Sequence, residues 1–88
     1  MKPVTLEVVH SPGCHPCKLF EEFWHSIEAD WPNVTFRDIS LITPEGQAMA
    51  QRYFILASPG IIVNGELWAT GGFDQEKLLT QLKEISQD

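Results

Sequence analysis

The chain has 88 residues, 43% of them hydrophobic and 20% charged, which is typical of one soluble globular domain. Its formal net charge of -6 and its six scattered Lys and Arg residues argue against a nucleic-acid partner, because phosphates require clustered basic side chains. No apolar run is long enough to cross a membrane, and the first residues enter a strand pattern without a signal peptide. We therefore expect a single domain over residues 1–88 of a monomeric, cytoplasmic protein.

The first half of the chain predicts a strand, a helix and a second strand. Residues alternate in character from Val4 to Val9, as they do in a half-buried strand. Ser11-Pro12-Gly13 ends that strand, and apolar residues then recur at helical spacing from about Cys14 to Asp30. A second strand is predicted from Val34 to Ile39.

The second half predicts a helix followed by a hairpin. Thr43 can cap a helix that runs to about Tyr53, with Ala48 and Met49 on its inner face beside Tyr53. Asn64-Gly65 is a strong signal for a tight turn between two antiparallel strands. These strands are predicted over 61–63 and 66–70.

A last helix begins after Asp74 and carries the apolar residues Leu78, Leu79, Leu82 and Ile85. The predicted order is therefore β-α-β-α-β-β-α, in an α/β domain. The first two strands can pair in parallel through a crossover helix, and the hairpin adds antiparallel strands. Helices then cover both faces of a four-stranded mixed sheet.

The only two cysteines, Cys14 and Cys17, lie at the junction of the first strand and the first helix. A bridge over so short a loop adds little stability, so the pair is more useful for chemistry. A helix N-terminus carries partial positive charge and free N–H groups, which favour a thiolate. We expect Cys14 to attack a substrate disulfide and the more shielded Cys17 to resolve the mixed disulfide that results.

The chain resembles the thioredoxin superfamily, most closely its small, glutaredoxin-sized members, over nearly its whole length. The resemblance is carried by Cys14-His15-Pro16-Cys17-Lys18, Ser58-Pro59, Asn64-Gly65-Glu66 and Gly71-Gly72. It implies a cis peptide bond before Pro59, with this proline against the active disulfide. It also implies that the backbone of Ser58 is free to pair with an extended substrate.

Three features depart from thioredoxins. Val8 occupies the place of the buried acid on their first strand, and Glu7 should point to the opposite face, so proton transfer has no assigned residue. Gly13 stands where thioredoxins have a tryptophan before the first cysteine. The chain also lacks the additional N-terminal strand and helix of a thioredoxin.

The two residues between the cysteines can tune the reaction. Pro16 stiffens the turn, and a protonated His15 would stabilise the neighbouring thiolate, although an exposed bystander role is as plausible for His15. With such tuning the reduction potential would lie between those of thioredoxin and protein disulfide isomerase, roughly -270 to -180 mV.

Gly71-Gly72-Phe73-Asp74 resembles the glutathione-binding segment of glutaredoxins, but a strand end followed by a helix cap is the favoured interpretation. Gly72 can still let a substrate backbone approach closely. The candidate catalytic residues are Cys14, Cys17, His15, Pro16 and Pro59. The candidate substrate-binding residues are Gly13, Ser58, Gly71, Gly72 and Phe73.

The predicted function is that of a thiol–disulfide oxidoreductase whose only redox group is the Cys14–Cys17 disulfide, with no cofactor and no metal site. Its partners would be protein disulfides or dithiols, with a reductase or glutathione as electron donor. One alternative is a metal-binding module or metallochaperone, in which His10 or His15 assists the cysteines. Against this, Pro16 stiffens a loop that metal transfer prefers flexible. A second alternative is a non-catalytic adaptor that uses the fold only to bind a partner.

Overall fold

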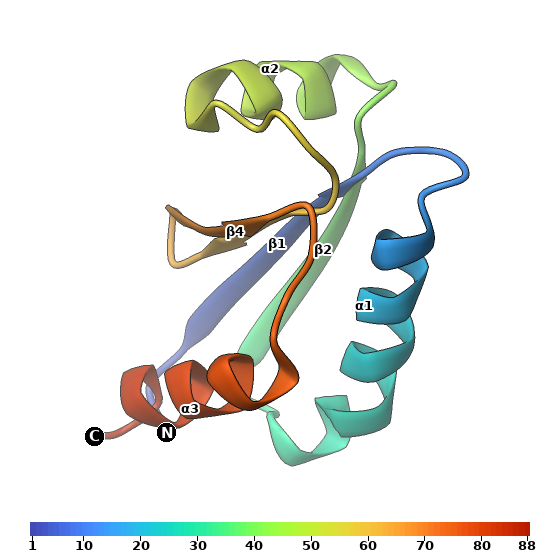
Figure 1. Cartoon of the computed structure of the whole chain (residues 1–88). Helices are drawn as coiled ribbons and strands as arrows, with labels where there is room; N and C mark the ends of the chain where they lie inside the picture. Colours follow the sequence, from blue (N-terminus) through green and yellow to red (C-terminus); the bar gives the residue numbers. More distant parts are fainter.

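The fold is built on one four-stranded mixed sheet, and the computed structural model describes all of residues 1–88 (Figure 1). The strands lie in the order β2-β1-β3-β4, with β1 parallel to β2 and antiparallel to β3, and with β3 antiparallel to β4. Their bounds are Val4–His10 (β1), Val34–Ser40 (β2), Gly60–Val63 (β3) and Glu66–Thr70 (β4). The predicted α/β class, element order and mixed sheet are confirmed.

Three helices cover the sheet, and they lie on both of its faces, as predicted (Figure 1). α1 and α3 lie on one face, and α2 lies on the other. The helices span His15–Ile27 (α1), Pro44–Tyr53 (α2) and Gln75–Ile85 (α3), and a 3-10 turn, Glu28–Asp30, continues α1. No helix combines the length and the apolar character needed to cross a membrane.

The main core lies between the sheet and the pair α1 and α3. Alternation along β1 turns Val4, Leu6 and Val8 toward these helices, where all three are buried. They meet apolar side chains at helical spacing on α1 and α3, namely Phe20, Trp24, Leu78 and Leu82. Burial of this stripe fixes α1 across the end of β1, and the first turn of α1 carries both cysteines.

Helix α2 approaches the sheet closely in its first turn. Gly46 is buried there, and a Cβ atom at this position would overlap the carbonyl group of Ser40 at the end of β2. Met49 and Tyr53 are half-buried, as predicted, but Ala48 is exposed, so its predicted place on the inner face was wrong. The close contact is made by a glycine near the start of the helix, so the spacing of apolar residues along α2 did not reveal which side of the helix meets the sheet.

Local capping signals agree with the structure. The Thr43 hydroxyl accepts a hydrogen bond from the Gly46 N–H at 3.1 Å, and Asp74 accepts one from Lys77 at 3.0 Å. Asn64 and Gly65 have φ angles of 50° and 79°, the left-handed pair that a tight hairpin turn requires. The hairpin β3–β4 is therefore set by its own sequence.

The two termini lie side by side, at the end of the molecule away from the N-terminus of α1 (Figure 1). The amino group of Met1 is 3.1 Å from a carboxylate oxygen of Asp88. The Lys2 N–H also donates to the carbonyl oxygen of Ser86 at 3.0 Å. The end of α3 is thus joined to the segment that enters β1.

Candidate redox site

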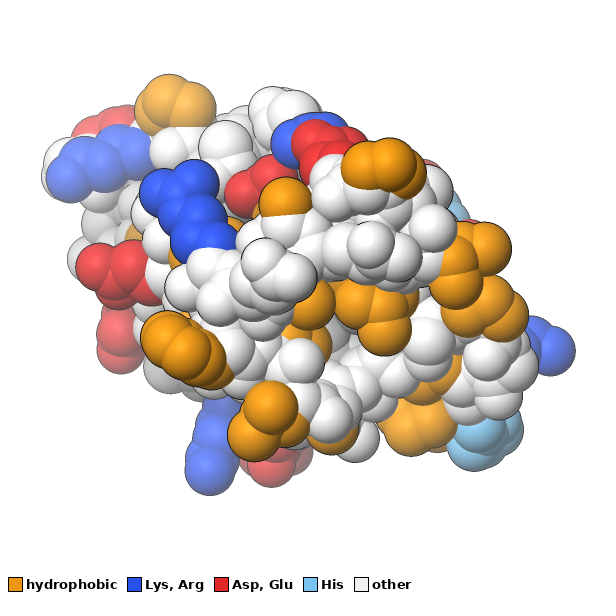
Figure 2. Space-filling model, turned by 90° about the horizontal axis from the view of Figure 1, so that it is seen from above, with side chains coloured by type: hydrophobic (Ala, Val, Ile, Leu, Met, Phe, Trp, Pro, Cys, Tyr) orange, Lys and Arg blue, Asp and Glu red, His pale blue; other side chains and the backbone are white.

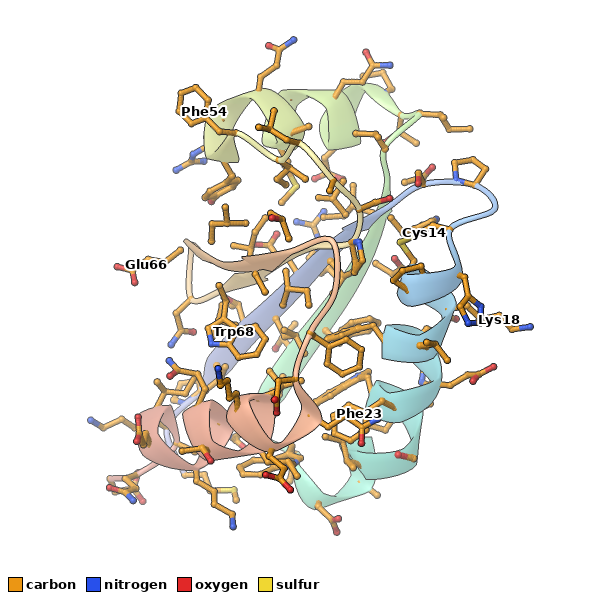
Figure 3. The ribbon with its side chains drawn as sticks, viewed as in Figure 1. Cys14, Lys18, Phe23, Phe54, Glu66 and Trp68 are labelled. Carbon is orange, nitrogen blue, oxygen red and sulfur yellow. A yellow bond between two sulfur atoms is a disulfide. The ribbon has the colours of Figure 1, made fainter.

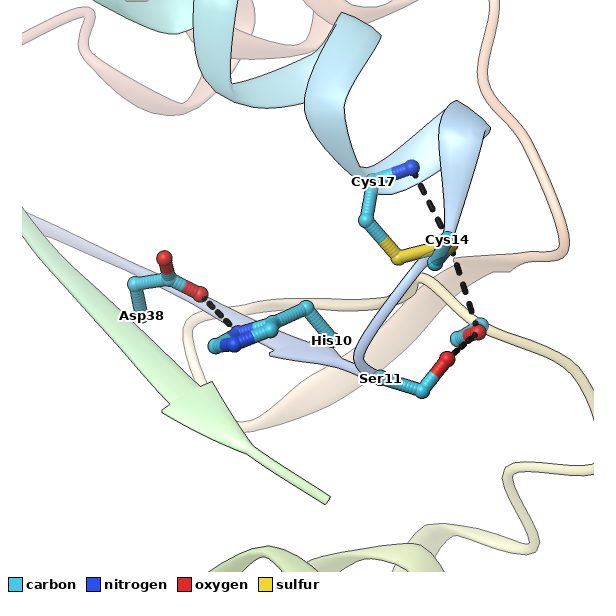
Figure 4. Close-up of a disulfide and its surroundings, with 6 residues drawn as sticks. His10, Ser11, Cys14, Cys17 and Asp38 are labelled. Atoms are coloured by element: carbon cyan, nitrogen blue, oxygen red, sulfur yellow. Dashed lines mark hydrogen bonds and ion pairs between the residues drawn. A yellow bond between two sulfur atoms is a disulfide. The ribbon is translucent and has the colours of Figure 1, made fainter. Parts of the chain in front are cut away.

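A disulfide joins Cys14 and Cys17 at the N-terminus of α1, with 5.3 Å between the two Cα atoms (Figure 4). Cys14 is the N-cap residue, and its sulfur accepts a hydrogen bond from the Cys17 N–H at 3.2 Å. Cys14 is half-buried, whereas Cys17 is only 7% exposed. The sulfur of Cys14 is therefore the one that a visiting molecule can reach more easily.

The turn between β1 and α1 puts the disulfide beyond the C-terminal end of β1, an inner strand of the sheet. β1 ends at His10, and the Cys14 N–H donates to the carbonyl oxygen of Ser11 at 3.3 Å to close the turn. Gly13 has a φ angle of 72°, which favours glycine, and nothing lies within 4 Å of the place where a Cβ would stand. The predicted residue Gly13 therefore shapes the turn.

The segment before β3 lies against Cys14. The hydroxyl of Ser58 is 3.4 Å from the Cys14 sulfur and 2.7 Å from the hydroxyl of Ser11 (Figure 4). The Ser58–Pro59 peptide bond is cis, and Pro59 is buried. The carbonyl oxygen of Pro59 accepts a hydrogen bond from Gly71 at 3.0 Å, but the backbone N–H and C=O of Ser58 have no partner in the chain.

An open cleft of about 400 Å³ lies beside the disulfide, between α1 and the ends of β1 and β2. Apolar side chains, including Val8 and Phe36, form part of its lining. Two polar side chains on the strands, His10 and Asp38, also line it, and His10 Nδ1 is 2.6 Å from Asp38 Oδ1 (Figure 4). The sequence drew attention to His10, but Asp38 was missed.

The other predicted residues are distributed more widely. His15 is exposed on the first turn of α1, and Pro16 beside it is half-buried. A Cβ atom added to Gly71 would lie 3.4 Å from Ala57, whereas the space around Gly72 is open. A side chain at Gly72 would therefore meet no other residue at its first carbon atom.

Phe73 does not present its ring as a free substrate-binding surface. Its ring centroid lies 4.8 Å from that of Phe20 and 5.6 Å from that of Phe23, both on α1. Figure 3 shows Phe23 on the side of α1 that faces α3. Phe73 thus packs against α1 and links it to the start of α3.

Two further charged side chains near the disulfide lie on α1. Lys18, one turn after Cys14, projects outward from α1 in Figure 3, and Glu21 follows it along the cleft. No group of three or more His, Cys, Asp or Glu side chains has the placement of a metal site.

Solved structures with the same architecture are thioredoxins. A thioredoxin O2 from Arabidopsis thaliana in the oxidised state has a TM-score of 0.77 and 16% identity, and the match covers 98% of this chain and 77% of that one. A mutant thioredoxin from Halobacterium salinarum has a TM-score of 0.76 and 21% identity, and the match covers 99% of this chain and 78% of that one. Mitochondrial thioredoxin 3 from Saccharomyces cerevisiae has a TM-score of 0.75 and 18% identity, and the match covers 96% of this chain and 80% of that one.

No family model and no curated protein sequence matches the chain. At these identities the likeness to solved structures shows the fold, and the chain's disulfide lies within that fold at the N-terminus of α1. Fold and disulfide together fit a thiol–disulfide oxidoreductase in general.

Proposed function

We propose that this chain, which has the thioredoxin fold, uses its Cys14–Cys17 pair to exchange disulfides with protein partners. The observation that carries the proposal is the placement of the disulfide. It caps a helix N-terminus, with one accessible sulfur and one shielded sulfur. This is the environment in which a thiolate is stabilised and can react with another disulfide.

The reduced pair would act in two steps. The Cys14 thiolate attacks one sulfur of a substrate disulfide, forms a mixed disulfide and releases the other substrate sulfur as a thiolate. Cys17 then loses its proton and attacks the Cys14 sulfur, which releases the second substrate thiolate and forms the Cys14–Cys17 bond. The substrate gains two electrons, which the pair loses. The N–H of Cys17 and the hydroxyl of Ser58, both near the Cys14 sulfur, support its thiolate form.

Exposed backbone beside the disulfide favours an extended peptide as the substrate. Ser58 has a free N–H and a free C=O, and the open space at Gly72 leaves room for a second chain. An extended segment could therefore add main-chain hydrogen bonds next to Cys14.

We also propose that a reductase or glutathione donates the electrons that reduce the Cys14–Cys17 disulfide. Two thioredoxins of similar fold come from work on a complex with ferredoxin:thioredoxin reductase and on the thiol resolving mechanism of a yeast mitochondrial 1-Cys peroxiredoxin via glutathione/thioredoxin systems. We propose partners of the same chemical classes for this chain. Its reduction potential would lie at roughly -270 to -180 mV, between those of thioredoxin and protein disulfide isomerase.

An insulin-reduction assay on the wild type, Cys14→Ser and Cys17→Ser tests the proposal. We expect Cys14→Ser to be inactive and Cys17→Ser to accumulate mixed disulfides, which mass spectrometry detects as an added substrate mass. The matched control is His25→Gln on the exposed side of α1, which should retain full activity. Undiminished exchange by Cys14→Ser would refute the assigned roles. Tight metal binding without exchange by the wild type would favour a metallochaperone.

A further inference from the structure

We infer that His10 and Asp38 act as a pair in which His10 accepts the proton of Cys17 when this thiol resolves a mixed disulfide. The inference rests on the proposed function and adds the proton acceptor that the reaction needs. In this pair His10 is the proton acceptor, and Asp38 is a positioning residue that acts through the imidazole ring.

Strand geometry puts the pair on the same face of the sheet as the cysteines. His10 follows Val8 by two residues on β1, so both side chains point toward α1. Asp38 is the register partner of Val8 in the parallel pair β1–β2, and parallel partners point to the same face. His10, Asp38 and both cysteines accordingly line one cleft of about 400 Å³. Figure 4 shows the ring of His10 turned toward Asp38, with the disulfide on the other side of the His10 backbone.

The chemistry of Cys17 creates the need for a base. Cys17 is only 7% exposed, and a thiol in such surroundings does not ionise readily, because burial disfavours the charged form. Only the thiolate attacks a disulfide, so resolution requires removal of this proton. Val8, the strand residue beneath the cysteines, is apolar and offers no acceptor.

Five titratable side chains besides the cysteines line the cleft, namely His10, His15, Lys18, Glu21 and Asp38. Lys18 is a donor with no acceptor site when charged. His15 and Glu21 are exposed on α1, and Glu21 is turned toward His25, with 3.6 Å between the charged atoms. Only His10 has a partner within the cleft that fixes its ring.

The contact with Asp38 also determines which ring nitrogen of His10 is free to accept a proton. An ionised Asp38 can only accept hydrogen bonds, so His10 Nδ1 must carry the hydrogen of the 2.6 Å contact. The other ring nitrogen, Nε2, then has the free lone pair of a base. The side chains of His10 and Asp38 are 33% and 34% exposed, so solvent can take up the proton afterwards.

The step balances as follows. The Cys17 thiol gives its proton to His10 Nε2 through water in the cleft, and the Cys17 sulfur attacks the Cys14 sulfur of the mixed disulfide. The Cys14–Cys17 bond forms as the bond from Cys14 to the substrate sulfur breaks. The departing thiolate takes a proton from the imidazolium or from solvent, which restores neutral His10. The dithiol is oxidised, and the substrate disulfide is reduced.

A stopped-flow reaction of the fully reduced protein with dithiobis-nitrobenzoate separates the two thiol steps. Attack by Cys14 releases one coloured thiolate at a rate that depends on reagent concentration. Resolution by Cys17 releases a second at a rate that does not. His10→Gln should slow the second phase about tenfold or more at neutral pH and leave the first within about twofold. The difference between the two proteins should narrow as the pH rises, because hydroxide can then remove the proton in place of His10.

Asp38→Asn should slow the same phase, and Asp38→Glu should restore part of the rate. His25→Gln is the matched control, because His25 is also paired with a carboxylate, Glu28 at 3.3 Å, but lies outside the cleft. It should change neither phase.

The role of the pair would be overturned if wild type and His10→Gln had equal second-phase rates at every pH. It would also be overturned if His10→Gln slowed both phases equally. A wild type with no second phase would instead overturn the proposed exchange activity itself, and the inference with it.

Discussion

Single side chains around Cys14 control how easily its sulfur becomes a thiolate. Ser58 offers a hydroxyl at 3.4 Å from this sulfur, and the same hydroxyl is paired with Ser11 at 2.7 Å. A hydroxyl that donates to a thiolate stabilises the charged form more than the neutral thiol. Ser58 therefore contributes through its side chain, whereas the sequence singled it out for its backbone.

Ser58→Ala should slow the reaction of the reduced protein with iodoacetamide at neutral pH by about five- to tenfold, because the thiolate loses a charged hydrogen bond. The rate constant, followed by mass spectrometry over a range of pH, measures the effect. Ser11→Ala is the control, since it leaves the hydroxyl of Ser58 next to Cys14 and should change the rate much less. An equal effect of the two substitutions would contradict a specific contact between Ser58 and the sulfur.

Phe54 has a backbone conformation that suits glycine better. It ends α2 with φ 55° and ψ 47°, and it is 80% exposed. Figure 3 shows its ring at the end of α2, on the outside of the molecule. A left-handed conformation costs a residue with a side chain about 1–2 kcal/mol, part of which glycine loses again through the entropy of the unfolded chain. The aromatic ring gains little burial in return.

Phe54→Gly should therefore raise the free energy of unfolding by about 0.5–1 kcal/mol, as measured by urea denaturation of the oxidised protein. Phe54→Ala removes the same ring but keeps a Cβ atom, so it should give no such gain. A glycine variant no more stable than the alanine variant would show that the backbone conformation is not strained.

At the scale of elements, the packing of α2 against the sheet depends on the close approach of Gly46 to Ser40. A Cβ atom at Gly46 would lie too close to the carbonyl group of Ser40, which is backbone and cannot rotate away. Gly46→Ala should therefore lower the free energy of unfolding by about 1–3 kcal/mol, despite the better helix propensity of alanine. Gln47→Ala, on the exposed side of the same turn, should change it by less than about 0.5 kcal/mol. A neutral Gly46→Ala would mean that α2 can move away from β2.

The elements themselves were largely predictable because their signals are local. Thr43, Asp74 and Asn64-Gly65 act on backbone groups within a few residues, and each appears in the structure where the sequence predicts it. The exposed Ala48 was not predictable, because a short helix with a weak stripe does not reveal which of its ends meets the sheet. That depends on the close approach at Gly46, a tertiary contact.

One ion-pair network joins three elements on the α2 side of the sheet. Arg37 on β2 donates to Glu45 of α2 at 2.6 Å and to Glu7 of β1 at 3.0 Å. The hydrogen bond and charge of Glu45, with a further contribution from Glu7, raise the pKa of Arg37 above its usual value. Where its carboxylate partners are ionised, a base with a raised pKa stabilises the fold at pH values below its ordinary pKa and loses that effect as pH rises through the raised one.

The difference in unfolding free energy between wild type and Arg37→Gln should thus stay constant from about pH 7 to about pH 10. It should shrink as salt is added, because the guanidinium is exposed and its charge is screened. Lys83→Gln removes a cation that makes no ion pair and should show no salt-dependent difference of this kind. A loss in Arg37→Gln that persists in high salt would point to packing instead of charge.

At the scale of the whole molecule, the sequence revealed the part of the site that is contiguous in the chain. The motif from Cys14 to Cys17 and its place before a helix are local features, and the disulfide forms as predicted. The pair of His10 with Asp38 joins residues 28 positions apart, and it depends on the register of β1 against β2. Short sequence patterns do not specify register, so Asp38 could be recognised only in three dimensions.

Apolar side chains remain exposed on the face that carries α2. Figure 2 shows apolar side chains on the surface seen from above. Ile42 and Phe54, just before and just after α2, are 70% and 80% exposed. Together with Leu56 they lie in or next to the segments that flank α2. These exposed apolar side chains thus lie beside the helix that Gly46 brings close to the end of β2.

The adjacency of Met1 and Asp88 means that the chain is nearly a closed loop in space. A short glycine-rich linker could connect the two ends, and new ends could be opened at the exposed Asn64-Gly65 turn without cutting a helix or the core strand β1. A rearranged chain of this kind would keep the cysteines in an uninterrupted segment. Any protein fused at the original ends would extend away from the sulfur atoms and leave them accessible.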